Sequence, residues 1–174
     1  TVEVRCRGVG GGLFSWLSGQ DLDLRRAAEQ GDANEVRRLL EAKGDVDATA
    51  TLFNRTPLHI SIEKEHWEVS RILLAARANV HNTDKDERTP LHLSAARGCV
   101  EISQRLVGAG ANVNATNIEE KTPLHESARA GHVEVSQMLV GEGANVHAMD
   151  NDGNTPLHLA AREGHMEMSQ MLIG

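Results

Sequence analysis

Along most of the chain, apolar residues recur at steps of three and four, which places them on one face of an α-helix. The pattern is clearest over residues 97–107, 130–140 and 163–173. Each of these segments follows a shorter run that contains small residues, and a glycine separates the two runs at Gly98, Gly131 and Gly164. The apolar and polar positions therefore predict pairs of short helices joined by tight turns.

The helix pairs belong to a repeat with a fixed period. The tetrapeptide Thr-Pro-Leu-His begins at Thr56, Thr89, Thr122 and Thr155, so each copy starts 33 residues after the previous one. Threonine caps helices well and proline fits their first turn, so each tetrapeptide predicts a helix start. A unit of this size cannot bury its own apolar face, and neighbouring units must therefore stack around one shared core.

This set of motifs resembles the ankyrin-repeat family over residues 21–174. The resemblance implies an all-α fold, an ankyrin-repeat solenoid of stacked helix-turn-helix units with β-hairpin or finger loops. We expect a non-repeat segment with a Gly-rich linker (1–20), an N-terminal capping unit (21–50), repeats at 51–83, 84–116 and 117–149, and a truncated repeat at 150–174. Arg25 and Arg26 are expected to make the outer face of the capping unit soluble.

Both ends of the array leave alternatives open. The apolar cluster at residues 13–17 packs against the capping unit, belongs to an upstream domain, or docks onto another molecule. One extra residue falls around Ala48–Thr51, which predicts a local bulge in the first finger. The last unit has no capping pattern, so we expect further repeats or another domain beyond Gly174.

Composition limits the kind of core, the class of partner and the cellular compartment that the protein can have. Aromatic residues make up 2% of the chain, so the core must be aliphatic, and the net charge of −7 argues against a general nucleic-acid binder. Two cysteines make no disulfide framework, which favours a reducing compartment. No apolar run approaches the roughly 20 residues of a membrane span. We expect an intracellular monomer, in the cytoplasm or the nucleus, that does not bind membranes.

The nine histidines suggest metal binding or catalysis when each is considered alone. His125, within Lys-Thr-Pro-Leu-His-Glu-Ser, resembles part of a hydrolase site, but the same histidine recurs once per repeat. Equivalent residues of stacked units lie ~10 Å apart, too far for one zinc ion. The resemblance implies that each Thr-His pair bonds internally and ties its unit to the next loop. We therefore expect no metal site, no cofactor and no enzyme activity.

Departures from the repeat mark the positions where backbone or function differs. The glycine expected in each finger is replaced by Asn54, Glu87 and Glu120, and only Gly153 keeps it. Asn tolerates a left-handed backbone but Glu does so poorly, so the fingers with Glu87 and Glu120 are predicted to be strained or differently turned. Glu65 and Arg77 replace two further glycines, and sequence drift at a modest stability cost is the simplest explanation.

In the family, fingertips and the exposed face of each first helix line a concave surface that binds partner proteins. The residues that the period places there, and that we take as candidate partner-binding residues, are Leu52, Phe53, Arg55, Lys64, Lys85, Arg88, Arg97, Ile118, Lys121, Arg129 and Arg162. The basic ones predict a localised positive stripe with apolar residues at its edge, as in interface hot spots. The alternative is that they only solubilise the surface.

We therefore expect a non-catalytic scaffold or adaptor that binds an acidic or phosphorylated segment of a partner protein on its concave face. The alternative function is a ligand-sensing regulatory domain that binds a nucleotide or oligonucleotide through the same basic stripe. The scarcity of aromatic residues makes nucleic acid the poorer partner. Asn114 lies in a finger sequence similar to those modified by the oxygen-sensing asparaginyl hydroxylase, which makes it a candidate hydroxylation site.

Overall fold

A computed structural model describes residues 19–49 and 53–174; for residues 19–22 it describes the backbone only. This part of the chain contains ten α-helices and no strand. They are α1 (Gly19–Gln30), α2 (Ala33–Glu41), α3 (Pro57–Glu63), α4 (Trp67–Ala75), α5 (Pro90–Arg97), α6 (Val100–Gly108), α7 (Pro123–Ala130), α8 (Val133–Gly141), α9 (Pro156–Arg162) and α10 (Met166–Ile173). Leu52 and the apolar cluster at residues 13–17 lie outside the described residues, as does part of the predicted bulge.

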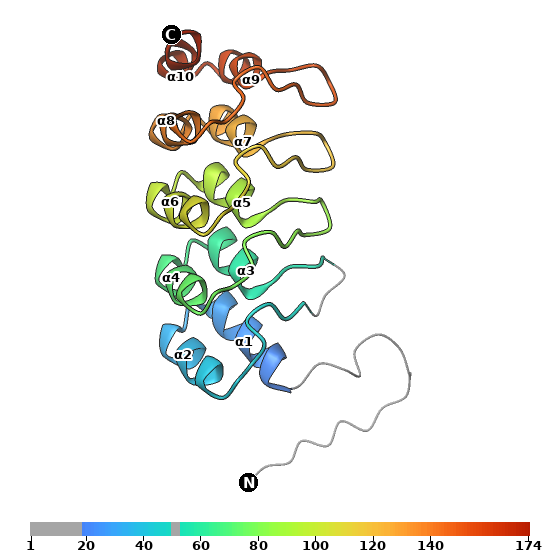
Figure 1. The fold of residues 1–174 in the computed structure, drawn as a ribbon, viewed down its shortest axis with the longest axis vertical. Helices are drawn as coiled ribbons and strands as arrows, with labels where there is room; N and C mark the ends of the chain where they lie inside the picture. The colour runs from blue at the N-terminus through green and yellow to red at the C-terminus, as the bar shows by residue number, and fades with distance from the viewer. Residues whose placement is uncertain (1–18, 50–52) are drawn as a thin grey trace.

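The helices form five antiparallel pairs stacked in one column (Figure 1). The first helices, α1, α3, α5, α7 and α9, contact one another in series, and so do the second helices. The finger loops all project from the column on the side of the first helices. The predicted all-α solenoid of stacked helix pairs is confirmed.

Each Thr-Pro-Leu-His tetrapeptide starts a first helix in the same way. Threonine is the N-cap residue of α3, α5, α7 and α9, and proline occupies the first turn. The threonine hydroxyl receives the backbone N–H of the histidine, and the histidine side chain receives that of the threonine. Two N–H groups that a helix start leaves unpaired are thereby satisfied.

The core consists of aliphatic side chains repeated from unit to unit. The leucine of each tetrapeptide is fully buried in the three central units, at Leu58, Leu91 and Leu124. Buried serine pairs also join the two helices of each central unit, since the hydroxyls of Ser61 and Ser70 lie 2.8 Å apart. Ser94–Ser103 and Ser127–Ser136 repeat this contact at 2.9 and 2.7 Å. Each of the three central units therefore carries both an apolar and a polar link between its helices.

The fingers keep one turn geometry although three of them lack the expected glycine. Asn54, Glu87 and Glu120 have φ angles of 51°, 58° and 56°, in the left-handed region that Gly153 also occupies at 76°. Of the two expectations from sequence, the strained backbone is therefore the correct one. Neighbouring fingers are joined by one backbone bond each, such as that from the Ile118 N–H to the Asp86 carbonyl at 3.1 Å.

Candidate functional site

The tetrapeptide histidines connect each unit to the next one. In His59 the Nδ1 atom lies 2.8 Å from the Thr56 hydroxyl, and Nε2 lies 3.1 Å from the carbonyl oxygen of Arg88. His92 and His125 reach the carbonyls of Lys121 and Asn154 at 3.0 and 3.1 Å. A carbonyl only accepts, so Nε2 must carry the proton and donate it.

These rings are neutral and fully occupied. Burial lowers the pKa of His59 to about 4, and it also lowers the pKa of His92 and His125. A catalytic base needs a free nitrogen directed at a substrate, whereas both nitrogens of each ring are bonded within the protein. Among the described residues, no group of three or more His, Cys, Asp or Glu side chains is placed to hold a metal ion. His125 therefore serves as a structural link.

A second set of histidines reaches in the opposite direction, to the preceding unit. The Nε2 atoms of His66, His132 and His165 lie 3.1 Å from the carbonyls of Glu29, Ala96 and Arg129. Cys99 takes this position in the remaining unit, and its sulfur replaces the ring. There the Arg97 Nε donates to the Glu63 carbonyl at 3.3 Å instead. This bond joins the two units that a histidine joins elsewhere in the stack.

The fingers and first helices enclose a central hollow of about 450 Å³. It lies between α5, α7 and their fingers, and its charged and exposed apolar lining residues are Glu63, Asp86, Arg88, Arg97, Ile118, Glu119, Lys121, Glu126 and Arg129. Five of the candidate residues from sequence meet here: Arg88, Arg97, Ile118, Lys121 and Arg129. Ile118 is 52% exposed and offers an apolar surface beside charged groups.

A second hollow of about 500 Å³ lies at the N-terminal end of the same concave surface. It is lined by Arg25, Glu29, Phe53, Arg55, Ile60, Glu63, Lys64 and Arg97. The candidates Phe53, Arg55 and Lys64 therefore lie here, and Lys85 approaches the Phe53 ring at 5.1 Å. Arg162 borders neither hollow and lies 3.6 Å from Glu163.

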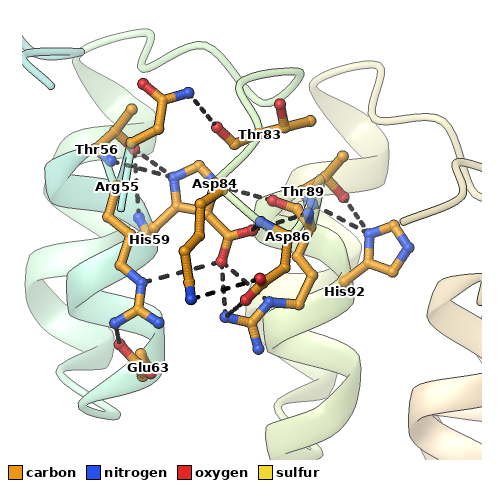
Figure 2. A network of polar contacts seen from close by, with 12 residues as sticks. Arg55, Thr56, His59, Glu63, Thr83, Asp84, Asp86, Thr89 and His92 are labelled. Atoms are coloured by element: carbon orange, nitrogen blue, oxygen red, sulfur yellow. Dashed lines mark hydrogen bonds and ion pairs between the residues drawn. The ribbon is translucent and has the colours of Figure 1, made fainter. Parts of the chain in front are cut away.

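Carboxylates hold most of the candidate cations in place. Figure 2 shows the Asp84 carboxylate near Arg55, which lies 3.9 Å from it. Arg88 donates two bonds to one oxygen of the same carboxylate, at 2.7 and 3.0 Å. Arg55 in turn donates to Glu63 at 2.6 Å. Burial alone would raise the pKa of Asp84, but the bonds from Arg88 bring the pKa below its ordinary value. Arg88 is therefore a structural part of its finger as well as a surface residue.

The same pairing continues into the next unit. Lys121 donates to Glu119 and Arg129 to Glu126, both at 2.8 Å. Four basic residues (Arg88, Arg97, Lys121, Arg129) face four acidic ones (Glu63, Asp86, Glu119, Glu126) in the central hollow. The centre of the groove is thus charge-balanced, whereas the sequence predicted a localised positive stripe. The prediction rested on the basic residues at one repeat position and left out the carboxylates beside them.

Two lining residues were missed from sequence. Glu126 is buried at a position where the other units carry Ile60, Leu93 and Leu159. A charged residue in an otherwise aliphatic position was the signal that was available. Arg25 was assigned to the outer face of the capping unit, but it is partly buried and lines the N-terminal hollow.

Asn114 lies outside both hollows, in an exposed part of its finger. Its side-chain oxygen accepts the Asn145 N–H at 2.8 Å, and its amide nitrogen donates to the Gly143 carbonyl at 3.1 Å. Both polar atoms of this exposed side chain are therefore bonded within the protein.

A column of stacked helix pairs with a groove along its fingers is the architecture of a repeat-type binding protein. The chain belongs to the ankyrin repeat family, since a family model described as "Ankyrin repeats (3 copies)" matches residues 24–117 and 106–174. A search of curated proteins finds no match. Ankyrin repeats are generally protein–protein interaction modules and typically non-catalytic. Within the described residues, none of the helices has the length and hydropathy to cross a membrane.

Proposed function

We propose that this chain is a non-catalytic adaptor that binds an extended segment of a partner protein along its concave groove. The observation that carries the proposal is the pair of hollows between fingers and first helices, which Arg97 and Glu63 both border. Such a surface offers an exposed apolar residue in each half, Phe53 and Ile118, beside charged groups. Interfaces of this kind draw most of their affinity from a few anchoring residues surrounded by polar contacts.

The charges indicate what the partner segment carries. In the central hollow each cation already has a carboxylate, so a strongly acidic stretch would face repulsion from Glu119 and Glu126. A polar or mixed-charge stretch fits better there. The acidic or phosphorylated residue expected from sequence belongs at the N-terminal hollow, where basic residues outnumber acidic ones.

We also propose an intracellular, monomeric protein; among the described residues the partly exposed Cys99 forms no disulfide, which fits a reducing compartment. Hydroxylation of Asn114 stays a separate proposal, which mass spectrometry of the chain after treatment with an asparaginyl hydroxylase would test.

The groove is tested with peptides selected from a random phage-displayed library on the immobilised chain. We expect the Ile118→Ala, Lys121→Ala double variant to weaken the selected peptides by about ten-fold or more, because an apolar anchor and a cation are lost. Arg88 is left unchanged because its substitution would leave the buried carboxylate of Asp84 without its main partner.

The matched control is Val140→Ala with Arg105→Ala, which removes the same two kinds of side chain from second helices, on the side opposite the fingers. Equal weakening by both double variants, or none by the groove variant, would contradict binding at the groove. Competition by ATP or an oligonucleotide at the same affinity would favour the ligand-sensing alternative.

A further inference from the structure

We infer that the N-terminal hollow binds a phosphorylated serine or threonine of the partner segment. This inference rests on the proposed function and assigns one part of the groove to one kind of side chain. The hollow is formed by α1, α3 and the finger that precedes α3, with Arg97 of α5 at its border.

The first argument is the local charge. Four basic residues (Arg25, Arg55, Lys64, Arg97) line the hollow, against two acidic ones (Glu29 and Glu63). The lining residues alone thus carry two more positive than negative charges, although Asp84 lies 3.9 Å from Arg55 and Glu65 lies 3.7 Å from Arg97 beyond the lining. A phosphomonoester, with a charge of about −2 near neutral pH, complements such a lining. The protein as a whole has a net charge of −7, so this surplus is local.

The second argument is that the surplus is confined to this hollow. In the adjoining central hollow, four basic and four acidic residues balance. A long acidic stretch would need a continuous positive surface, whereas a compact dianion needs several cations around one point. Guanidinium groups pair especially well with phosphate oxygens because they donate parallel N–H bonds. The distribution of charge therefore favours one phosphate over a row of carboxylates.

Lys64 is the cation most available to a ligand. It is the exposed C-cap residue of α3, and among the described residues it forms no ion pair. Arg55, in contrast, is held by Glu63 at 2.6 Å, and Arg97 lies 3.7 Å from Glu65. An incoming phosphate would meet Lys64 directly and share the bound arginines with their carboxylates.

Phe53 and Ile60 make the remainder of the hollow apolar, which suits the residue next to a phosphorylated one. The Phe53 ring is 47% exposed and has the Arg55 guanidinium 5.6 Å and the Lys85 ammonium 5.1 Å from its centre. Stacking of a nucleotide base on this ring would have to displace those cations. The ring is therefore better placed to contact an aliphatic neighbour of the phosphate at its edge.

The test uses fluorescein-labelled peptide libraries with phosphoserine, serine or aspartate at a fixed centre and random flanking positions. Binding to the 174-residue chain is followed by fluorescence anisotropy. We expect the phosphoserine library to bind about ten-fold more tightly than the serine and aspartate libraries. Lys64→Ala should remove most of this preference, Lys64→Arg should retain it, and Arg105→Ala, which removes a cation from α6, should leave it unchanged.

Equal binding of the three libraries, or a preference that survives Lys64→Ala, would overturn the inference. If the phage-selected peptides still lose affinity in the Ile118→Ala, Lys121→Ala variant, the proposed function stands even though this inference fails. Loss of both the phosphoserine preference and the Ile118 and Lys121 dependence would refute the two together.

Discussion

Single residues in this chain hold backbone conformations that their side chains do not favour. Glu87 and Glu120 are exposed and occupy the finger position at which Gly153 has the same left-handed backbone. No bond of either side chain to another described residue offsets the strain. The strain therefore lowers the free energy of unfolding, and the finger bonds and helix caps around these residues keep the backbone in place.

Glu87→Gly and Glu120→Gly are each expected to raise the free energy of unfolding by about 1 kcal/mol, because glycine accepts a positive φ without a Cβ clash. Urea denaturation followed by circular dichroism measures the change. The control is Gly153→Ala, for which we expect a loss, although an added Cβ would meet no atom within 4 Å. A loss of stability in the two glycine variants would show that the glutamate side chains have a structural role.

Helix pairs are coupled to their neighbours through the turn between their two helices. A Cβ at Gly31, Gly98 or Gly131 would lie 2.8, 2.5 or 2.7 Å from a ring nitrogen of the second-set histidine in the next unit. Glu65 occupies this glycine position with a φ of 61°, and the next unit carries Cys99 in place of the histidine. The two departures therefore compensate each other, which explains why both occur in the same pair of units.

Cys99→His alone is expected to destabilise the protein by about 1–3 kcal/mol, because the ring would overlap the Glu65 side chain. In combination with Glu65→Gly, the histidine should find the space and the Glu63 carbonyl that its counterparts use. A double-mutant cycle on unfolding free energies measures this coupling. Additive effects of the two substitutions would rule out the compensation.

At the scale of the whole molecule, stability depends on a row of neutral histidines. In the unfolded chain a histidine has a pKa near 6.5, whereas burial lowers the pKa of His59 to about 4 and also lowers that of His92 and His125. Between these values the unfolded state takes up protons that the folded state excludes, so stability falls as the pH falls.

We therefore expect full stability above about pH 6.5 and a progressive loss from there towards about pH 4. His59 alone accounts for about 3 kcal/mol, since one pKa unit corresponds to about 1.4 kcal/mol. Urea midpoints measured at intervals from pH 7.5 to 4.5 give the slope, and His59→Gln should make it shallower. A flat profile in the parent chain would show that these rings take up protons at the same pH in the folded and the unfolded state.

The fold was largely predictable because it follows from repetition. Four copies of one tetrapeptide located the helix starts, and the histidine bonds to neighbouring loops followed from the family resemblance. The electrostatics of the groove were not predictable in the same way. Whether Arg88 faces a partner or the buried Asp84 depends on how the finger folds back, and that information is not periodic. Arg25 shows the same limit, since only the stacked structure places it in the N-terminal hollow, whereas Glu126 could have been found from its repeat position.

The joint between units tolerates different amino acids at the position that accepts the histidine bond. The tetrapeptide histidines bond to the main-chain carbonyls of Arg88, Lys121 and Asn154, and not to their side chains. Three different amino acids thus maintain the same joint. The joint itself therefore does not depend on which side chain stands at this position, so substitutions at Lys121 and Asn154 can change what the groove binds while the units stay joined; Arg88 is more constrained because it also pairs with the buried Asp84.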